Sequence, residues 1–140
     1  MTNPVIIDSS GLISFISDTD SNHQLAVSIS QSIKKEKNSV ILPGEIFSEI
    51  VNVLGKKVSH NIALQTAHHI LNSKDFAIVE TNTEIREGAL EIFRNQAQSV
   101  SFTDCLVMAF ADHYHTKTIF GFDEVFRKNK YQRLGLDNAL

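Results

Sequence analysis

The sequence predicts an α/β protein: a three-layer α/β/α sandwich with a central, mainly parallel sheet. Four short apolar runs recur along the 140 residues, and segments with helical periodicity separate them. Runs of this kind are typical of buried strands, and their alternation with helices favours parallel neighbours covered on both faces. No internal repeat, low-complexity tract or Pro-rich or Gly-rich linker divides the chain. We therefore expect a single domain over residues 1–140, long enough to bury its own core.

The predicted strands are short and rich in β-branched residues, which suits strands buried on both faces. They are "PVII" at 4–7, "SVIL" at 39–42, "FAIV" at 76–79 and "KTIF" at 117–120. Six helices are predicted around them, at 10–17, 22–36, 44–57, 60–73, 83–97 and 102–115. Start signals support several of these boundaries. Asp20 or Ser21 is suited to cap the second helix, Pro43 to open the third, Ser59 to cap the fourth, and Thr81 or Thr83 to cap the fifth.

The last predicted helix begins within "SVSFTDCLVMAFADHY", where an acid stands directly before a run of apolar residues. Ser101 and Asp104 have the spacing of a capping box, which satisfies free backbone N–H groups at a helix start. Asp104 would also lie at the positive end of the helix dipole. A cap therefore explains this acid without any function. Cys105, the only cysteine, is expected to be a small core residue, and its being alone excludes an internal disulfide and a cysteine-based metal site.

The composition is that of an ordinary soluble protein, with 42% hydrophobic and 21% charged residues. The longest fully apolar stretch, residues 105 to 111, is too short to cross a bilayer, and "MTNPVIID" lacks the basic and then apolar pattern of a signal peptide. We expect a cytoplasmic protein with no membrane partner. The net charge of −3 argues against nonspecific, charge-driven binding to nucleic acid, but it leaves open a nucleic-acid enzyme whose acids are balanced by metal ions.

Two acids follow predicted strands. Asp8 comes directly after the strand at 4–7, and Asp123 follows the strand at 117–120 after two intervening residues. In an open parallel sheet, ligands bind beyond the carboxyl ends of the strands, near the point where the strand order reverses. Each acid taken alone is explained equally well by a helix cap or a turn. Two such acids on different strands weaken that explanation for both.

A third acid, Glu49, lies inside the helix predicted at 44–57. The helical period places it just beside an apolar arc, while Glu45 and Asn52 lie further out on the same polar flank. The arc consists of Ile46, Phe47, Ile50, Val51, Val53 and Leu54. Because this helix begins right after a strand, its early turns are also expected near the carboxyl edge of the sheet. The alternative is a solvated surface residue without a function.

The fourth acid is Asp104, because its helix leads back along the sheet into the strand at 117–120. We therefore expect Asp8, Glu49, Asp104 and Asp123 to converge at one edge. Close carboxylates repel one another, and each resists ionising unless a cation balances it. Oxygen ligands without cysteine or paired histidine favour a hard ion, Mg²⁺ or Mn²⁺.

Other residues point less clearly to a function. The six histidines show no His-Glu-x-x-His spacing and are expected at the surface. The segment "RKNKYQR" at 127–133 either contacts RNA phosphates, with Tyr131 stacking on a base, or forms a solvated helix end. A phosphate-transfer enzyme of the haloacid dehalogenase type, with Asp8 as its nucleophile, is disfavoured because that pattern needs an acid where this chain has Ser10.

The ordered segments "VIIDSSGLI", "LPGEIFSEIVNVL", "SFTDCLVMAFA" and "IFGFDEVF" resemble a PIN domain, and the chain length resembles that of VapC toxins. The resemblance covers nearly the whole chain, and it depends on the order and context of the four segments because each contributes a single acid. Carried over residue by residue, the metal-binding acids of the family fall on Asp8, Glu49, Asp104 and Asp123. Ser9 matches the small hydroxyl residue that often follows the first acid.

The resemblance implies a Mg²⁺- or Mn²⁺-dependent endoribonuclease that hydrolyses RNA phosphodiester bonds. It also implies the toxin of a type II toxin–antitoxin pair, with a cognate antitoxin as partner, and a homodimer. Asp104 and Asp8 would hold the main ion, Glu49 would bind it through water or help to activate the nucleophile, and Asp123 would complete the site or a second, weaker one. Two alternatives remain open: a non-catalytic PIN-like binding module, and an orphan nuclease outside any toxin–antitoxin pair.

Gly121 departs from the pattern of the family. Its members often carry Ser or Thr two residues before the last acid, where the hydroxyl supports the site, and here that donor is missing. The position of Asp123 and the presence of a second metal therefore do not follow from the resemblance.

Overall fold

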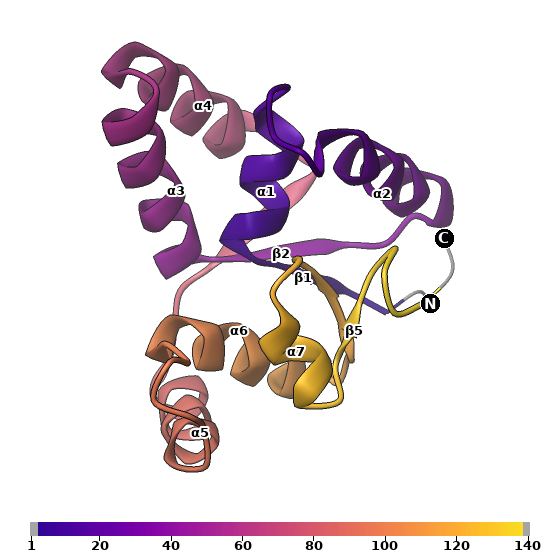
Figure 1. Ribbon diagram of the computed structural model, residues 1–140, viewed down its shortest axis with the longest axis vertical. Helices are drawn as coiled ribbons and strands as arrows, with labels where there is room; N and C mark the ends of the chain where they lie inside the picture. Colours follow the sequence, from indigo (N-terminus) through magenta and orange to yellow (C-terminus); the bar gives the residue numbers. More distant parts are fainter. Residues whose placement is uncertain (1–2, 139–140) are drawn as a thin grey trace.

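The computed structural model describes residues 3–138 and centres on a parallel sheet with the strand order β3-β2-β1-β4-β5 (Figure 1). The strands are β1 Val5–Ile7, β2 Val40–Pro43, β3 Phe76–Val79, β4 Thr118–Phe120 and β5 Gln132–Arg133. In the register of the central strand β1, Val5 pairs with Val40 of β2 and Ile6 pairs with Ile119 of β4. All the strand pairs are parallel, so the predicted fold class is confirmed. The sequence analysis did not predict β5.

Helices cover both faces of the sheet (Figure 1). They are α1 Ser9–Ile16, α2 His23–Glu36, α3 Gly44–Lys57, α4 His60–Asn72, α5 Thr83–Arg94, α6 Phe102–His113 and α7 Glu124–Lys128. The first four lie on one face, whereas α6 and α7 lie on the other and α5 packs outside α6. Every predicted helix is present, and its ends lie within three residues of the predicted bounds. Within residues 3–138 no helix is long and apolar enough to span a membrane.

Helix α6 is the most deeply buried helix. All the residues of its apolar run, 105 to 111, are buried, including Met108 and Phe110 with no exposed surface. A helix that is apolar all round must be covered on all sides, and α6 meets this need by lying between the sheet and α5. Cys105 is buried there, so its predicted role as a core residue is confirmed. The packing of α6 fixes the place of its first turn, where Asp104 lies.

The predicted helix caps are partly correct. Ser59 caps α4 by accepting a hydrogen bond from the Ile62 N–H, and Ser101 caps α6 as predicted. The prediction for α5 was wrong, because Asn82 caps this helix, while the Thr81 hydroxyl donates to Glu45 instead. Asp20 does not cap α2 directly; the N-cap is Asn22, whose backbone N–H donates to the Asp20 carboxylate. Pro43 ends β2 and precedes the first residue of α3.

The order of the strands indicates where on the sheet a ligand is expected to bind. After β1 the chain continues to β2 on one side, and β4 lies on the other side of β1, so the order reverses between β1 and β4. Ligands of open parallel sheets bind beyond the carboxyl ends of the strands at this point. Asp8 follows β1, and Asp123 follows β4. Both acids therefore lie at the place where this class of fold binds its ligands.

Candidate metal-binding active site

Asp8 occupies the N-cap position of α1 and is buried, with 5% of its surface exposed. Its backbone N–H donates to the Phe120 carbonyl at 3.0 Å, and its Oδ2 accepts from the Ser10 hydroxyl at 3.0 Å. Burial raises the pKa of Asp8 to about 6, although hydrogen bonds from Ser9 and Ser10 oppose this, and the charges of Asp104 and Glu49 raise it further. A buried carboxylate with raised pKa is typical of functional sites, because its ionised form needs a cation.

Glu49 lies on the flank of α3, next to the buried residues Ile46 and Ile50 of the same helix. Partial burial raises the pKa of its carboxyl group, and the charge of Asp104 adds to this effect, while the Ser9 hydroxyl opposes it. Glu45, one turn earlier, accepts a hydrogen bond from Thr81 at 2.7 Å. The contacts therefore distinguish two acids that lie on the same flank, and they associate Glu49 with the other candidate ligands.

Asp104 combines a structural contact with the position expected of a ligand. Its backbone N–H donates to the Ser101 hydroxyl at 3.0 Å, and its Oδ2 accepts from the Ser101 N–H at 3.2 Å, which completes a capping box. These bonds engage Oδ2 and leave Oδ1 for another partner. Partial burial raises the pKa of Asp104, Ser101 lowers it, and the charge of Asp123 raises it.

Asp123 is the N-cap of α7, where its Oδ1 accepts from the Val125 N–H at 3.0 Å. It is exposed, unlike Asp8, and the only candidate acid whose pKa it affects is Asp104. Asp104 is therefore the acid that connects the set, because it interacts electrostatically with Asp8, Glu49 and Asp123. Asp123 lies at the margin of this group of four acids.

The donor set fits a hydrated hard cation better than a closed metal cage. Among residues 3–138, no group of three or more His, Cys, Asp or Glu side chains is arranged so that it could hold a metal ion. Mg²⁺ keeps several waters and is commonly bound by one or two carboxylates together with substrate phosphates. Burial is the largest cause of the raised pKa values of Asp8, Glu49 and Asp104, and the charges of neighbouring acids raise them further, so a bound cation would favour the ionised forms. The chemistry of the donors therefore fits Mg²⁺ or Mn²⁺.

Close packing around residue 121 explains why this position is a glycine. A Cβ atom at this position would lie 2.9 Å from the Asp8 Cβ and 3.2 Å from a ring carbon of Phe126. The first distance is shorter than real Cβ contacts allow, so a side chain here would displace Asp8 or the chain after β4. A hydroxyl does lie near this point, but it comes from Ser10, which bonds to Asp8 and to the Phe122 N–H. This role of Ser10 was not predicted from the sequence.

Of the two alternatives for the segment 127–133, contact with RNA is contradicted for Tyr131 and Arg133. Tyr131 is buried, and its hydroxyl donates to Asp112 at 2.7 Å, so its ring is not free to stack on a base. Arg133 is also buried and donates to both oxygens of Asp137. Arg127 pairs with Glu124 at 2.6 Å. The solvated helix end is confirmed for Arg127 and Lys128, which are exposed in the last turn of α7, whereas Gln132 and Arg133 form β5 and join the sheet.

A cleft of about 600 Å³ adjoins the candidate site and is open to solvent. Its lining includes Glu49 together with polar side chains from α3 and from the start of α6: Glu45, Ser48, Asn52 and Thr103. Glu45 and Asn52 lie on the polar flank of α3 as predicted, whereas the cleft itself was not predicted from the sequence.

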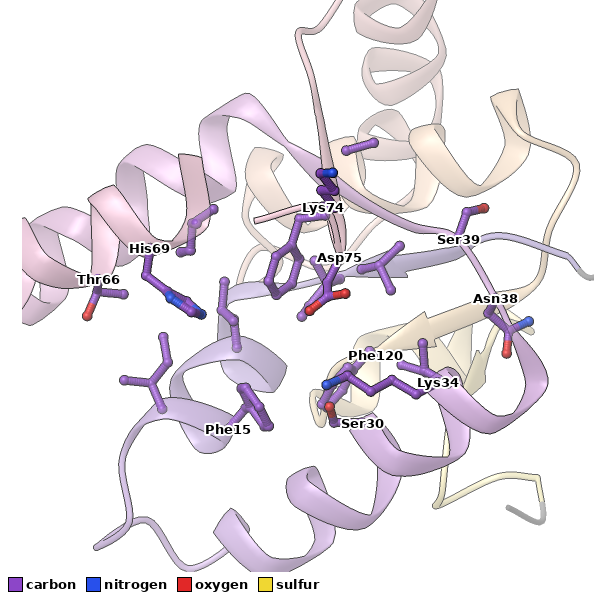
Figure 2. Close-up of a pocket in the computed structure, with 18 of the residues that line it drawn as sticks. Phe15, Ser30, Lys34, Asn38, Ser39, Thr66, His69, Lys74, Asp75 and Phe120 are labelled. Carbon is purple, nitrogen blue, oxygen red and sulfur yellow. The ribbon is translucent and has the colours of Figure 1, made fainter. Parts of the chain in front are cut away.

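A larger cavity of about 1060 Å³ lies elsewhere, between α1, α2 and α4 and near the amino ends of β2 and β3 (Figure 2). Figure 2 shows Phe15, His69, Lys34 and Asp75 around its interior. Its lining contains none of the four candidate acids. The cavity is therefore separate from the candidate metal-binding site.

Comparisons with known proteins agree with the fold. The sequence model of the PIN domain matches residues 5–130. VapC20 of Mycobacterium tuberculosis, a toxin that cleaves the sarcin-ricin loop, has a similar crystal structure, with a TM-score of 0.78, 18% sequence identity, and coverage of 91% of this chain and 96% of that chain. The comparison with curated proteins gives no match. Since the family model spans most of the sequence, this chain belongs to the PIN domain family.

Proposed function

We propose that this protein is a metal-dependent endoribonuclease that hydrolyses RNA phosphodiester bonds with Mg²⁺ or Mn²⁺. The observation that carries the proposal is the electrostatic coupling of Asp8, Glu49 and Asp104 at the carboxyl edge of the sheet, with Asp123 beside Asp104. Membership of the PIN domain family supports the nuclease class. Acids without a compensating cation would repel RNA, so metal binding has to precede or accompany substrate binding.

The degree of burial of each of the four acids indicates its role in the reaction. Asp8 and Asp104 hold the ion, because one is rigidly buried and the other is fixed by the capping box. Once bound, the ion supplies positive charge beside the phosphate and lowers the pKa of a water. Glu49 is less buried and has a raised pKa, so its carboxylate is suited to take a proton from the attacking water. Asp123 supports the outer side of the site, and no protein nucleophile is required.

Metal removal tests this proposal. The purified protein is expected to cleave a mixed RNA sample when Mg²⁺ or Mn²⁺ is present in large excess over the protein, because the site is then loaded by mass action. Excess EDTA is expected to stop cleavage, and restoring Mn²⁺ should restore the activity. Cleavage that continues unchanged in EDTA would contradict the metal-dependent mechanism.

The affinity for Mn²⁺ is expected to fall as the pH is lowered through about 6. Asp8 must be ionised to bind a cation, and its pKa is raised to about 6 by burial. Affinity should therefore be nearly constant above pH 7 and should weaken by up to about tenfold for each pH unit below 6, because protons compete for the ligand. Calorimetric titrations at several pH values measure this. An affinity that stays constant down to about pH 4.5 would show that Asp8 is not a ligand or is not perturbed as described.

We further propose that the protein is the toxin of a toxin–antitoxin pair and acts on RNA in the cytoplasm. The similarity in fold to VapC20 supports this proposal. Expression of the wild-type chain should arrest growth, whereas a variant lacking one of the metal-binding acids should not. A small neighbouring reading frame whose product co-purifies with the chain and relieves the arrest would identify the antitoxin. Without an arrest, an orphan nuclease is the better assignment. The predicted homodimer is tested by a mass measurement in solution.

A further inference from the structure

One hydroxyl group joins the turn after β1 to the loop after β4. Ser10 lies in the first turn of α1, and its Oγ donates a hydrogen bond to Oδ2 of Asp8 at 3.0 Å. The same oxygen accepts a hydrogen bond from the Phe122 N–H at 3.0 Å. Phe122 directly precedes Asp123. Ser10 thus contacts one candidate ligand directly and holds the backbone next to another, across 112 residues of sequence.

The two bonds fix a direction for the Asp8 carboxylate. A serine hydroxyl has a single hydrogen, so when its oxygen is held by the Phe122 N–H the hydrogen is free to point at Asp8. Asp8 is 5% exposed, so little water can replace this donor. The Asp8 N–H also donates to the Phe120 carbonyl, which ties a second point of the same loop to the turn.

Gly121 lies between these two attachment points. A Cβ atom there would stand 2.9 Å from the Asp8 Cβ and 3.4 Å from its Oδ2. The absence of a side chain at residue 121 therefore lets the loop approach Asp8 closely enough for the Phe122 N–H to reach Ser10. The two residues act together: Ser10 supplies the hydroxyl on α1, and Gly121 leaves room for the loop to reach it.

We propose that Ser10, with Gly121 as its packing counterpart, is a positioning residue that orients Asp8 and the Asp123 loop for cation binding. This inference deepens the proposed function and rests on it for the identity of the ligand. Ser10 acts through Asp8 and need not touch the cation itself. Partners of metal ligands orient the ligating atoms, and their loss typically lowers metal affinity by about 10- to 100-fold.

The test compares two serines of the same helix. Ser14 is buried and donates to Asp20 at 3.0 Å, so Ser14→Ala removes a hydroxyl bond from α1 without touching the four acids. Mn²⁺ affinity is measured by titration calorimetry, and folding is checked by thermal unfolding in EDTA. Ser10→Ala is expected to bind Mn²⁺ about tenfold more weakly than the wild type. Ser14→Ala should change the affinity by less than about twofold, although the loss of a buried hydrogen bond should lower its unfolding temperature.

Two further variants keep the test decisive if Ser10→Ala unfolds. Ser10→Thr retains the hydroxyl and is expected to bind Mn²⁺ more tightly than Ser10→Ala. Gly121→Ala leaves Ser10 intact but forces the loop and Asp8 apart, and it is expected to weaken Mn²⁺ binding as Ser10→Ala does. Wild-type affinity in folded Ser10→Ala, or in folded Gly121→Ala, would overturn the proposal. The RNA assay is separate: wild-type protein that binds Mn²⁺ but does not cleave RNA would refute the proposed function, while the affinity ratios would still decide the role of Ser10.

Discussion

Replacing Asp8 with Asn is expected to abolish RNA cleavage and, at the same time, to make the metal-free protein more stable at neutral pH. Activity should fall at least about a hundredfold, because a neutral amide is a poor ligand for a hard cation and the charge stabilisation supplied by the ion is lost. Stability should rise because the substitution removes the charge of a buried carboxylate, whose desolvation destabilises the folded state. Loss of activity with gain of stability is typical of residues that are kept for function.

The pH dependence of this gain follows from the raised pKa. Folding moves the pKa of Asp8 from about 3.8 to about 6, so the ionised carboxylate costs roughly 3 kcal/mol in the folded state above pH 6. Below about pH 4 the group is protonated whether the chain is folded or unfolded, and this cost vanishes. Asp8→Asn should therefore gain stability at about pH 7.5, lose that advantage as the pH falls from about 6 to about 4, and be close to the wild type at about pH 3.5.

Urea unfolding in EDTA at about pH 7.5 and about pH 4 measures the effect, and an RNA assay on the same samples measures activity. Ser14→Ala serves as a control that loses a buried hydrogen bond of α1 without any change of charge. A variant that is less stable than the wild type at neutral pH, or that still cleaves RNA at the wild-type rate, would show that Asp8 has been assigned the wrong environment or the wrong role.

Replacing Phe110 with Ala is expected to lower the free energy of unfolding by about 3–5 kcal/mol. Phe110 has no exposed surface and lies on α6 within its buried apolar run, so its removal leaves a cavity between the sheet and the helices. Phe93 of α5 is a matched control, because its ring is 40% exposed and contacts Phe102 near the surface. Phe93→Ala should cost clearly less, as measured by urea unfolding. Equal losses for the two variants would contradict the central position of α6 in the core.

Local patterns of the sequence were sufficient to predict most of the fold. The strands β1 to β4 are apolar runs, and the helices α1 to α6 have regular apolar periodicity or clear start signals, so each is defined by its own residues. The strand β5 is different, because Gln132 and Arg133 are polar and only the pairing with β4 makes them a strand. The helix α7 is too short to show a period. The strand β5 thus depends on a contact with a more distant part of the chain, and its own segment carries no sign of that contact.

The positions of the candidate acids were predictable for a similar reason. Parallel topology sends the ends of β1 and β4 to one edge, so Asp8 and Asp123 follow from the order of the strands. The partners of these acids do not follow from it. Ser10 reaches Phe122 only in the folded chain, and the hydrogen bond from Tyr131 to Asp112, which contradicts an RNA contact by this ring, also forms only there. Side-chain pairing over long sequence separations is the part of the site that sequence patterns do not determine.

The most direct test of the central claim is RNA cleavage by Asp104→Asn beside the wild type, in Mn²⁺ and with identical purification. Asn keeps a side-chain oxygen that can accept from the Ser101 N–H, so the capping box survives, while the negative charge that raises the pKa values of Asp8 and Glu49 is removed. Asp18→Asn is the matched control, because Asp18 is exposed at the far end of α1. We predict that the wild type and Asp18→Asn cleave RNA equally and that Asp104→Asn does not. Equal cleavage by Asp104→Asn and the wild type would contradict the assignment of this carboxylate cluster as a nuclease site.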